Sequence, residues 1–165
     1  MTRLQSIWAP TENLSTDIKC SRISISRSVG GGEVFDVKLG RGALADIEFT
    51  AQWLILKHGA RHPELRATNT LRQLAAAHHA GLLTEADLGA VRDAYAFLRR
   101  AELRLQATQE HMPRALERSA PGFEAWARSV FPDLAPHGAA ALFCDQWHLH
   151  TVRVRPIMER VRDAL

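Results

Sequence analysis

Four residues in the stretch Phe35–Gln52 have the types and spacing of an anion-binding loop. Gly40 and Gly42 allow the backbone positive φ angles and a close approach to a ligand, and Lys38 and Arg41 add two cationic side chains to the same loop. The loop runs without a break into an apolar-rich segment. The loop therefore has two interpretations: a plain helix-entry loop with ion pairing, or a loop that faces an anionic ligand.

The segment after the loop carries two carboxylates, and its secondary structure decides what they can do. Polar and apolar residues alternate after Asp46, which is a strand period, and on a strand Asp46 and Glu48 would point the same way, as a magnesium-binding pair requires. On a helix they lie about 200° apart and do not form that pair. The segment is about 13 residues long, which exceeds the usual strand, and Gly59 stands where a helix C′ residue belongs. A helix over 46–58 is therefore favoured.

The whole stretch resembles the signature D-x-K-x-G-x-G-G-x-x-D-I-E-F-x-x-Q. This signature opens the helical domain after each nucleotidyltransferase domain in the bacterial glutamine synthetase adenylyltransferase (glutamate-ammonia-ligase adenylyltransferase) family. The matching positions are Asp36, Lys38, Gly40, Gly42, Asp46, Ile47, Glu48, Phe49 and Gln52. Ala43 replaces the second adjacent glycine, so a positive φ there would strain the loop. Looser similarity, including HPEL and FLRRAELRLQ, extends the resemblance over about residues 34–162.

The resemblance implies a supporting domain of an adenylyltransferase that lacks the catalytic core. The family's Gly-Ser and D-x-D motifs are absent, and no nucleophile has an evident base, so we expect no catalytic and no metal-binding residue in this chain. ATP and magnesium are expected as cofactors of the full-length family protein. Its expected partners are the nucleotidyltransferase domain, glutamine synthetase and the PII signalling protein. The residues expected to meet the catalytic domain and its nucleotide phosphates, and thus to bind cofactor, are Lys38, Gly40, Arg41, Gly42, Glu48 and Gln52.

Five helices joined by short loops are expected, which predicts an all-α fold, an antiparallel helical bundle. Asn69 and Thr84 supply N-caps for the second and third helices, and Pro156 should kink or divide the last one. The expected helices cover 46–58, 69–81, 84–105, 122–130 and 138–163.

Composition bounds the location and the organisation of the chain. The 165 residues carry a net charge of +3, without an apolar run long enough to span a bilayer or a secretory leader, so the cytoplasm is expected. Cys20 and Cys144 are expected to be ordinary reduced thiols. Residues 1–33 are polar and rich in serine and glycine, and we expect a flexible leader before a bundle domain at 34–165.

Two further groups of residues have a structural and a functional interpretation. His78 and His79, like His148 and His150, are spaced wrongly for ligands on one helix face, so structural or surface roles are favoured. The arginines near the ends of the third and last helices are interspersed with acidic residues, as on a solvated face.

Three residues on the third helix have two possible roles. Arg99, Glu102 and Gln106 share one helix face and form either a buried polar network or a partner-binding surface. Two alternative functions also remain: a stand-alone helical interaction module would expose an apolar patch, and a nucleic-acid-binding bundle would gather its arginines on one face.

Overall fold

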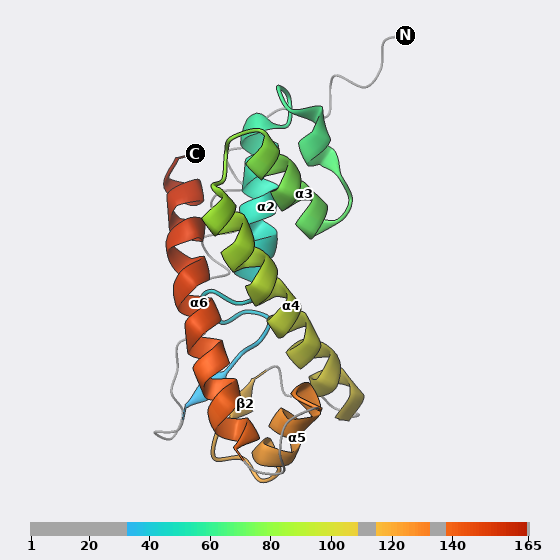
Figure 1. The fold of residues 1–165 in the computed structure, drawn as a ribbon, viewed down its shortest axis with the longest axis vertical. Coiled ribbons are helices and arrows are strands. Elements are labelled where there is room, and N and C mark those ends of the chain that lie inside the picture. The colour runs from blue at the N-terminus through green and yellow to red at the C-terminus, as the bar shows by residue number, and fades with distance from the viewer. Residues whose placement is uncertain (1–32, 109–114, 133–137, 165) are drawn as a thin grey trace.

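The computed structural model describes residues 33–108, 115–132 and 138–164, which are mostly helical (Figure 1). The α-helices of this part of the chain are α2 (Leu44–His58), α3 (Thr70–His79), α4 (Glu85–Thr108), α5 (Phe123–Val130) and α6 (Ala139–Asp163). A 3-10 helix, η1 (Pro63–Arg66), and two short strands, β1 (Val34–Phe35) and β2 (Leu116–Glu117), complete the described elements. The predicted all-α fold with five helices is confirmed. The sequence did not predict η1 or the antiparallel pairing of β1 with β2.

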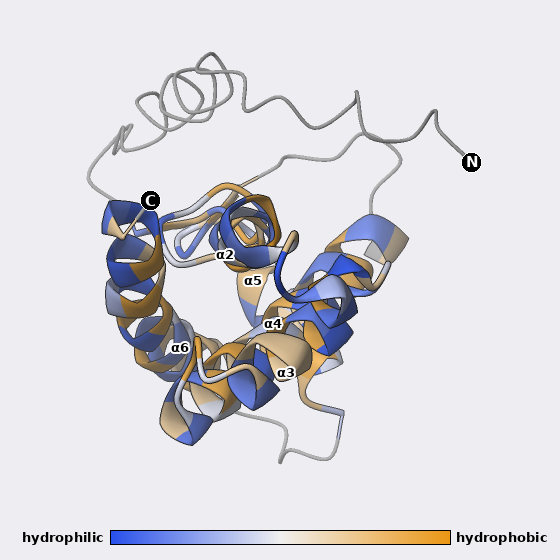
Figure 2. Cartoon of the chain, turned by 90° about the horizontal axis from the view of Figure 1, so that it is seen from above, coloured by the Kyte–Doolittle hydropathy of each residue, from blue (hydrophilic) through white to orange (hydrophobic). Residues whose placement is uncertain are grey.

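The two long helices, α4 and α6, run antiparallel along the molecule, and the shorter elements pack towards its two ends (Figure 1). α2, η1 and α3 lie towards one end, and α5 and the small sheet lie at the other. In the view along the long axis (Figure 2), α2, α4 and α6 surround a common interior. Buried aliphatic and aromatic side chains from all of these helices fill it as one core.

Local capping signals place the starts of α3 and α4. The Asn69 carboxamide oxygen accepts the Arg72 amide at 3.2 Å. Thr84 and Asp87 form a reciprocal box in which each side chain accepts the other's amide at 3.1 Å. The apolar stripe of α4 then faces the core as predicted, with Tyr95 half-buried and with Leu88, Val91, Leu98, Ala101 and Leu105 buried.

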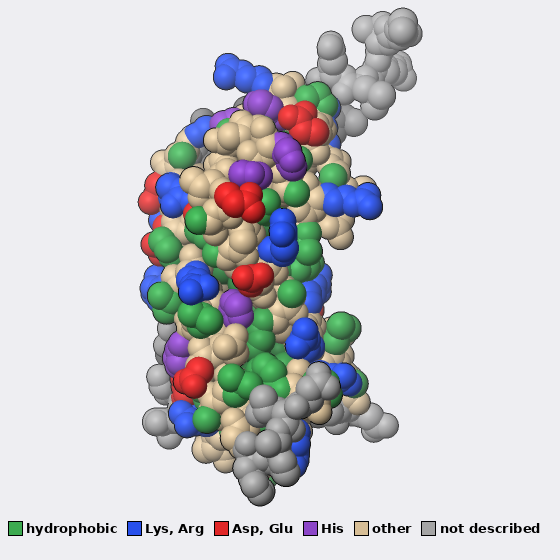
Figure 3. All heavy atoms as spheres, viewed as in Figure 1, with side chains coloured by type: hydrophobic (Ala, Val, Ile, Leu, Met, Phe, Trp, Pro, Cys, Tyr) green, Lys and Arg blue, Asp and Glu red, His purple; other side chains and the backbone are tan. Residues whose placement is uncertain are grey.

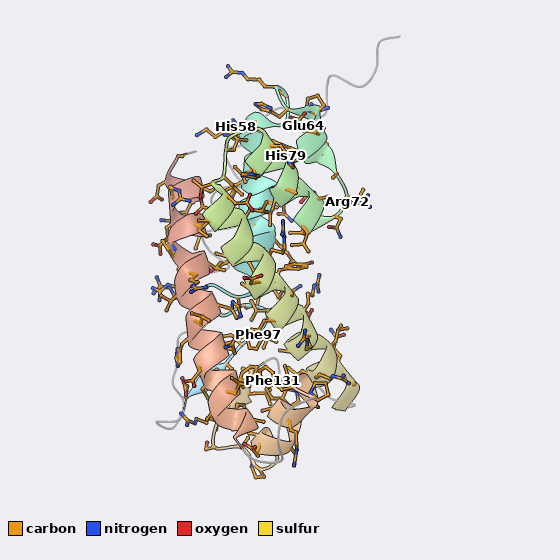
Figure 4. The ribbon with its side chains drawn as sticks, in the orientation of Figure 1. His58, Glu64, Arg72, His79, Phe97 and Phe131 are labelled. Atoms are coloured by element: carbon orange, nitrogen blue, oxygen red, sulfur yellow. The ribbon has the colours of Figure 1, made fainter. Side chains whose placement is uncertain are left out.

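Helices α2, α3 and α6 all terminate at the same end of the bundle, and each carries basic residues in its last turn. His58 and His79 mark this end in Figure 4. Lys57 of α2 and Arg160 and Arg162 of α6 offset the partial negative charge of two of these C-termini, whereas the last turn of α3 carries only histidines. The acidic first turn of α4 begins at the same place, and Asp87 pairs with Arg160 of α6 at 2.6 Å. The concentration of basic residues is therefore explained within the fold.

An aromatic cluster holds the opposite end together. Phe35 of β1 stacks on Phe123 with ring centroids 5.6 Å apart and meets Phe143 and Trp147 of α6 edge-on at 5.4 and 5.5 Å. This contact fixes the chain just before the signature loop. Phe97 of α4 and Phe131, both labelled in Figure 4, stack nearby at 6.3 Å.

Pro156 does not divide the last helix, which is continuous from Ala139 to Asp163. An internal proline costs about 3 kcal/mol through a lost hydrogen bond and a steric clash. Val154, Ile157 and Met158 are buried on both sides of it, and their packing offsets that cost. Of the two predicted outcomes, the division of the helix is therefore wrong, and the kink stays a prediction.

The predicted leader, like Cys20, lies outside the described residues except for Glu33. The Glu33 carbonyl accepts the Arg118 amide at 2.8 Å, and its carboxylate contacts His148 at 2.6 Å. Cys144 is a free, buried thiol whose pKa is raised by burial, as expected of a structural cysteine.

The face drawn in Figure 3 mixes basic and acidic side chains and shows no stripe of one sign. On this face, the distribution gives the nucleic-acid interpretation no support. None of the helices in the described residues combines the length and the apolar character of a membrane span.

Candidate functional site

Two buried aspartates hold the signature loop in shape. The Asp36 carboxylate accepts the amides of Lys38 at 3.1 Å and Leu39 at 2.7 Å, and the Asp36 carbonyl accepts the Gly40 amide at 2.9 Å. The Asp46 carboxylate, in the first turn of α2, reaches back to the Gly42 amide at 2.6 Å. The two signature aspartates therefore fix the backbone at the two ends of the loop by hydrogen bonds.

The loop glycines make close contact with α6. Gly42 has a φ of +78°, and a Cβ there would lie 2.9 Å from the Thr151 Cα and closer still to its carbonyl oxygen. A Cβ on Gly40 would lie 2.5 Å from the Asp36 carbonyl oxygen and 3.2 Å from the Trp147 ring. The close approach that these glycines permit in this structure is therefore to the protein's own backbone and core. Ala43 is extended at φ −87°, so the departure from the family signature causes no strain.

The amides at the start of α2 donate to the loop itself. Ala43 donates to the Gly40 carbonyl at 2.9 Å, Leu44 to Val37 at 3.3 Å, and Ala45 to Lys38 at 2.9 Å. A phosphate-binding helix N-terminus presents such donors to its ligand. Here these three amides are engaged within the loop and are not available to an anion.

The side chains that converge beyond the loop form an ion-pair cluster of Lys38, Glu48, Arg99 and Glu102. Arg99 of α4 donates to Glu48 of α2 at 3.1 Å and to Glu102 at 2.6 Å. Lys38 lies farther away, with its Nζ 3.4 Å from Glu48 and 3.9 Å from Glu102. The ion-pair cluster therefore joins the loop, α2 and α4, with Arg99 as its hub.

Arg99 is held by hydrogen bonds to Glu48, Glu102 and Tyr95. Its Nε donates to the Tyr95 hydroxyl at 3.1 Å, and its guanidinium carbon lies 5.3 Å from the centre of the Tyr95 ring. The hydrogen bonds to Tyr95 and then to Glu102 raise the pKa of Arg99 above its ordinary value. Arg99 is therefore a permanent cation with a fixed geometry.

The cations of the ion-pair cluster lie outside its carboxylates. The side chains of Lys38 and Arg99 are 41% and 39% exposed, whereas those of Glu48 and Glu102 are 24% and 11% exposed. Lys38 and Arg99 balance the two glutamates in charge, but a partner approaching from solvent meets the positive groups first. The surface presented by the cluster is therefore cationic.

The six residues predicted to bind cofactor do not converge on one point. Lys38 and Glu48 meet in the ion-pair cluster, and the two glycines pack against α6. Arg41 is directed to α6, where it pairs with Glu159 at 3.6 Å, and Gln52 is exposed on α2. Ligand binding by these six residues stays a prediction.

Of the set Arg99, Glu102 and Gln106, two residues form the predicted polar network. The i,i+3 spacing of Arg99 and Glu102 correctly predicted their pairing, whereas Gln106 is exposed to solvent. Sequence reasoning missed the link from Arg99 to Glu48, which are 51 positions apart. The sequence does contain a basic and an acidic residue in each of the motifs D-x-K…E and R-x-x-E. Nothing in the sequence indicates that the two motifs lie next to each other in the fold.

One of the histidines singled out by their spacing, His150, lies in the core. His150 is buried against Phe97 with ring centroids 5.0 Å apart, and burial lowers its pKa. Among residues 33–108, 115–132 and 138–164, no group of three or more potential ligands is placed to hold a metal ion.

Comparison with known proteins gives one family. The family model described as GlnD PII-uridylyltransferase matches residues 32–161. The chain is 41% identical over 101 residues to the bifunctional glutamine synthetase adenylyltransferase/adenylyl-removing enzyme of Aromatoleum aromaticum, covering 61% of this chain and 11% of the relative. The enzyme of the same name from Bradyrhizobium diazoefficiens is 40% identical over 102 residues, covering 61% and 10%.

A third relative of that name, from Streptomyces avermitilis, is 47% identical over 66 residues, which are 40% of this chain and 7% of the relative. The chain thus spans about a tenth of the length of the first two relatives. No solved structure matches it. The family-model match covers most of the chain and agrees with the resemblance seen in the loop signature. The chain therefore belongs to the GlnD PII-uridylyltransferase family, and its curated relatives are glutamine synthetase adenylyltransferases.

Proposed function

We propose that this chain is the helical domain of a glutamine synthetase adenylyltransferase-like protein and supports nucleotidyl transfer without catalysing it. Three observations support this proposal: the family match over residues 32–161, the small share of each relative that the chain covers, and the all-α fold. The catalytic motifs would then lie in the rest of the parent protein. In that parent the domain acts in nitrogen regulation, in the cytoplasm, where glutamine synthetase is the substrate and the PII signalling protein the regulator.

The ion-pair cluster is the observation that carries the proposed role. It connects the signature loop to α2 and α4 and places its cations outermost. The nucleotidyltransferase domain of the parent, holding ATP and magnesium, meets this side of the bundle. Lys38, Glu48 and Gln52 face that domain, while Gly40 and Gly42 shape the loop and Arg41 ties it to α6.

A domain replacement tests the proposal. The segment of the Aromatoleum relative that aligns with this chain is replaced by the 101 aligned residues of this chain, and adenylylation of glutamine synthetase is measured with labelled ATP and magnesium. We expect the chimera to retain activity, and the same protein with the segment deleted to lose it. We also expect the 165-residue chain alone to transfer no label.

Two results would contradict the proposal. A chimera that unfolds cooperatively but transfers no more label than the deletion variant would show that this chain does not supply the supporting function. Label transfer by the chain alone would show that it has a catalytic centre of its own.

A further inference from the structure

One side of α6 carries exposed apolar side chains. The helix runs along one edge of the described part of the chain in Figure 1 and in Figure 2. Leu149 is 39% exposed, Val152 is 61% exposed, and Pro156 is also exposed. Their spacings of three and four residues put these side chains on one face of a continuous helix. They form a short apolar stripe directed away from the core.

Charged side chains of opposite sign lie towards the two ends of this apolar stripe. Asp145 lies one turn before Leu149, and Arg153 and Arg155 lie on the two sides of the stripe in its second half. Within the described residues, Asp145, Arg153 and Arg155 make no ion pair. Other charged residues of this side are paired inside the chain: His148 with Glu33, Glu159 with Arg41, and Arg160 with Asp87. One acid and two bases therefore remain for a partner.

The order acid, apolar, base along α6 is complementary to itself when a second copy runs antiparallel. With the two-fold axis midway between positions 150 and 151, Leu149 of one copy lies opposite Val152 of the other. Asp145 then lies opposite Pro156 of the other copy. From the helical rise, Arg153 and Arg155 of that copy are offset from Asp145 by about 4.5 and 1.5 Å along the axis.

A parallel second copy is disfavoured by the same charges. In register it would place Asp145 opposite Asp145 and Arg153 opposite Arg153, and like charges across an interface are repulsive. The antiparallel copy instead places every unpaired charge of the face near one of opposite sign. The charges therefore select both the occupant and its direction.

We propose that Asp145, Leu149, Val152, Arg153 and Arg155 form an isologous interface through which two copies of this chain associate, with their α6 helices antiparallel. The apolar contacts lie at the centre, and a set of charge pairs lies at each end. The contact covers only about 17 Å of helix, and small interfaces bind weakly, so the expected Kd is above about 1 µM. The inference is independent of the proposed function, because association is measured in this chain alone.

Sedimentation equilibrium of the 165-residue chain, from about 10 µM to 1 mM, measures the association. We expect a reversible dimer. Val152→Asp should raise the Kd by at least about tenfold, and the matched control Leu103→Asp by less than about twofold. Leu103 is 62% exposed on α4, so the control also places a carboxylate at an exposed apolar position, but outside the interface.

An exchange of charges tests the antiparallel arrangement. One variant carries Asp145→Arg and so has only bases at the three positions, and the other carries Arg153→Asp with Arg155→Asp and so has only acids. Each variant alone should dimerise at least about tenfold more weakly than the unsubstituted chain. An equimolar mixture of the two should form a heterodimer with nearly the original affinity, because every charge pair is then opposite in sign.

Three results would overturn the proposal. The first is an unsubstituted chain that stays monomeric at about 1 mM. The second is an equal Kd for Val152→Asp and Leu103→Asp. The third is a mixture of the charge variants that associates no more tightly than either variant alone. Urea unfolding of each variant confirms that a loss of association is not a loss of folding.

Discussion

Replacing Gly42 by alanine tests the role of the signature glycines. Gly42 combines a φ of +78° with a tight contact against the backbone of Thr151. Alanine at a left-handed φ costs about 1–2 kcal/mol. Forcing a methyl group into a packed contact costs about 1–3 kcal/mol more. We therefore expect Gly42→Ala to lower the free energy of unfolding by about 2–5 kcal/mol.

Two other glycines separate these contributions. Gly81 has a φ of +72° but open space around its Cβ position, so Gly81→Ala should cost only the backbone strain, about 1–2 kcal/mol. Gly89 lies inside α4 with open space around it, so Gly89→Ala should stabilise the protein by about 0.8–1 kcal/mol.

Equilibrium urea unfolding, followed by helical circular dichroism, measures the three changes as shifts in midpoint at constant m-value. The order of stability should be Gly89→Ala, then the unsubstituted chain, then Gly81→Ala, then Gly42→Ala. Equal losses for Gly42→Ala and Gly81→Ala would refute the reasoning, because the contact between the loop and α6 would then contribute nothing. A loss for Gly89→Ala would refute the assignment of a regular helix at that position.

Three further predictions concern the core, the ion-pair cluster and a buried histidine. Leu98→Ala should cost about 2–5 kcal/mol in urea unfolding because the side chain is fully buried, while exposed Arg92→Ala should stay within about 0.5 kcal/mol; equal losses would mean a wrong helical phase. Arg99→Ala should lower the free energy of unfolding by about 2 kcal/mol, a value between those of exposed and buried ion pairs, because it leaves Glu48 and Glu102 with one distant cation. A loss of stability no larger than that of the exposed control Arg100→Ala would contradict the central role of Arg99 in the cluster. Burial lowers the pKa of His150, so its contribution to stability is fully present above about pH 6.5 and is lost as the pH falls from there through the lowered value. Unfolding measured between about pH 7.5 and 5 should show a flatter pH dependence for His150→Phe, and an unchanged slope would refute the assignment.

Local features of the fold were predictable because the interactions behind them span a few residues. The side chains of Asn69 and Thr84 cap their helices by accepting hydrogen bonds from the backbone amides three residues later. The apolar stripe of α4 follows from the helical period of about 3.6 residues. The pairing of Arg99 with Glu102 is likewise a single turn of helix. The alternation after Asp46 was ambiguous between strand and helix, and its length resolved it correctly. Gly59 ends the helix as its C-cap at a φ of −64°, not as the predicted C′ residue.

The sequence by itself determined which segments become the five α-helices, the approximate positions of their ends, and which loop carries the family signature. Only the tertiary structure decided that Glu48 meets Arg99 across 51 positions, and that Gly42 lies against Thr151. It also decided that α6 continues through Pro156. The physical reason is that capping and periodicity depend on neighbours along the chain. Ion pairs between helices, close backbone contacts and the packing that keeps a proline within a helix depend on neighbours that only the folded core brings together.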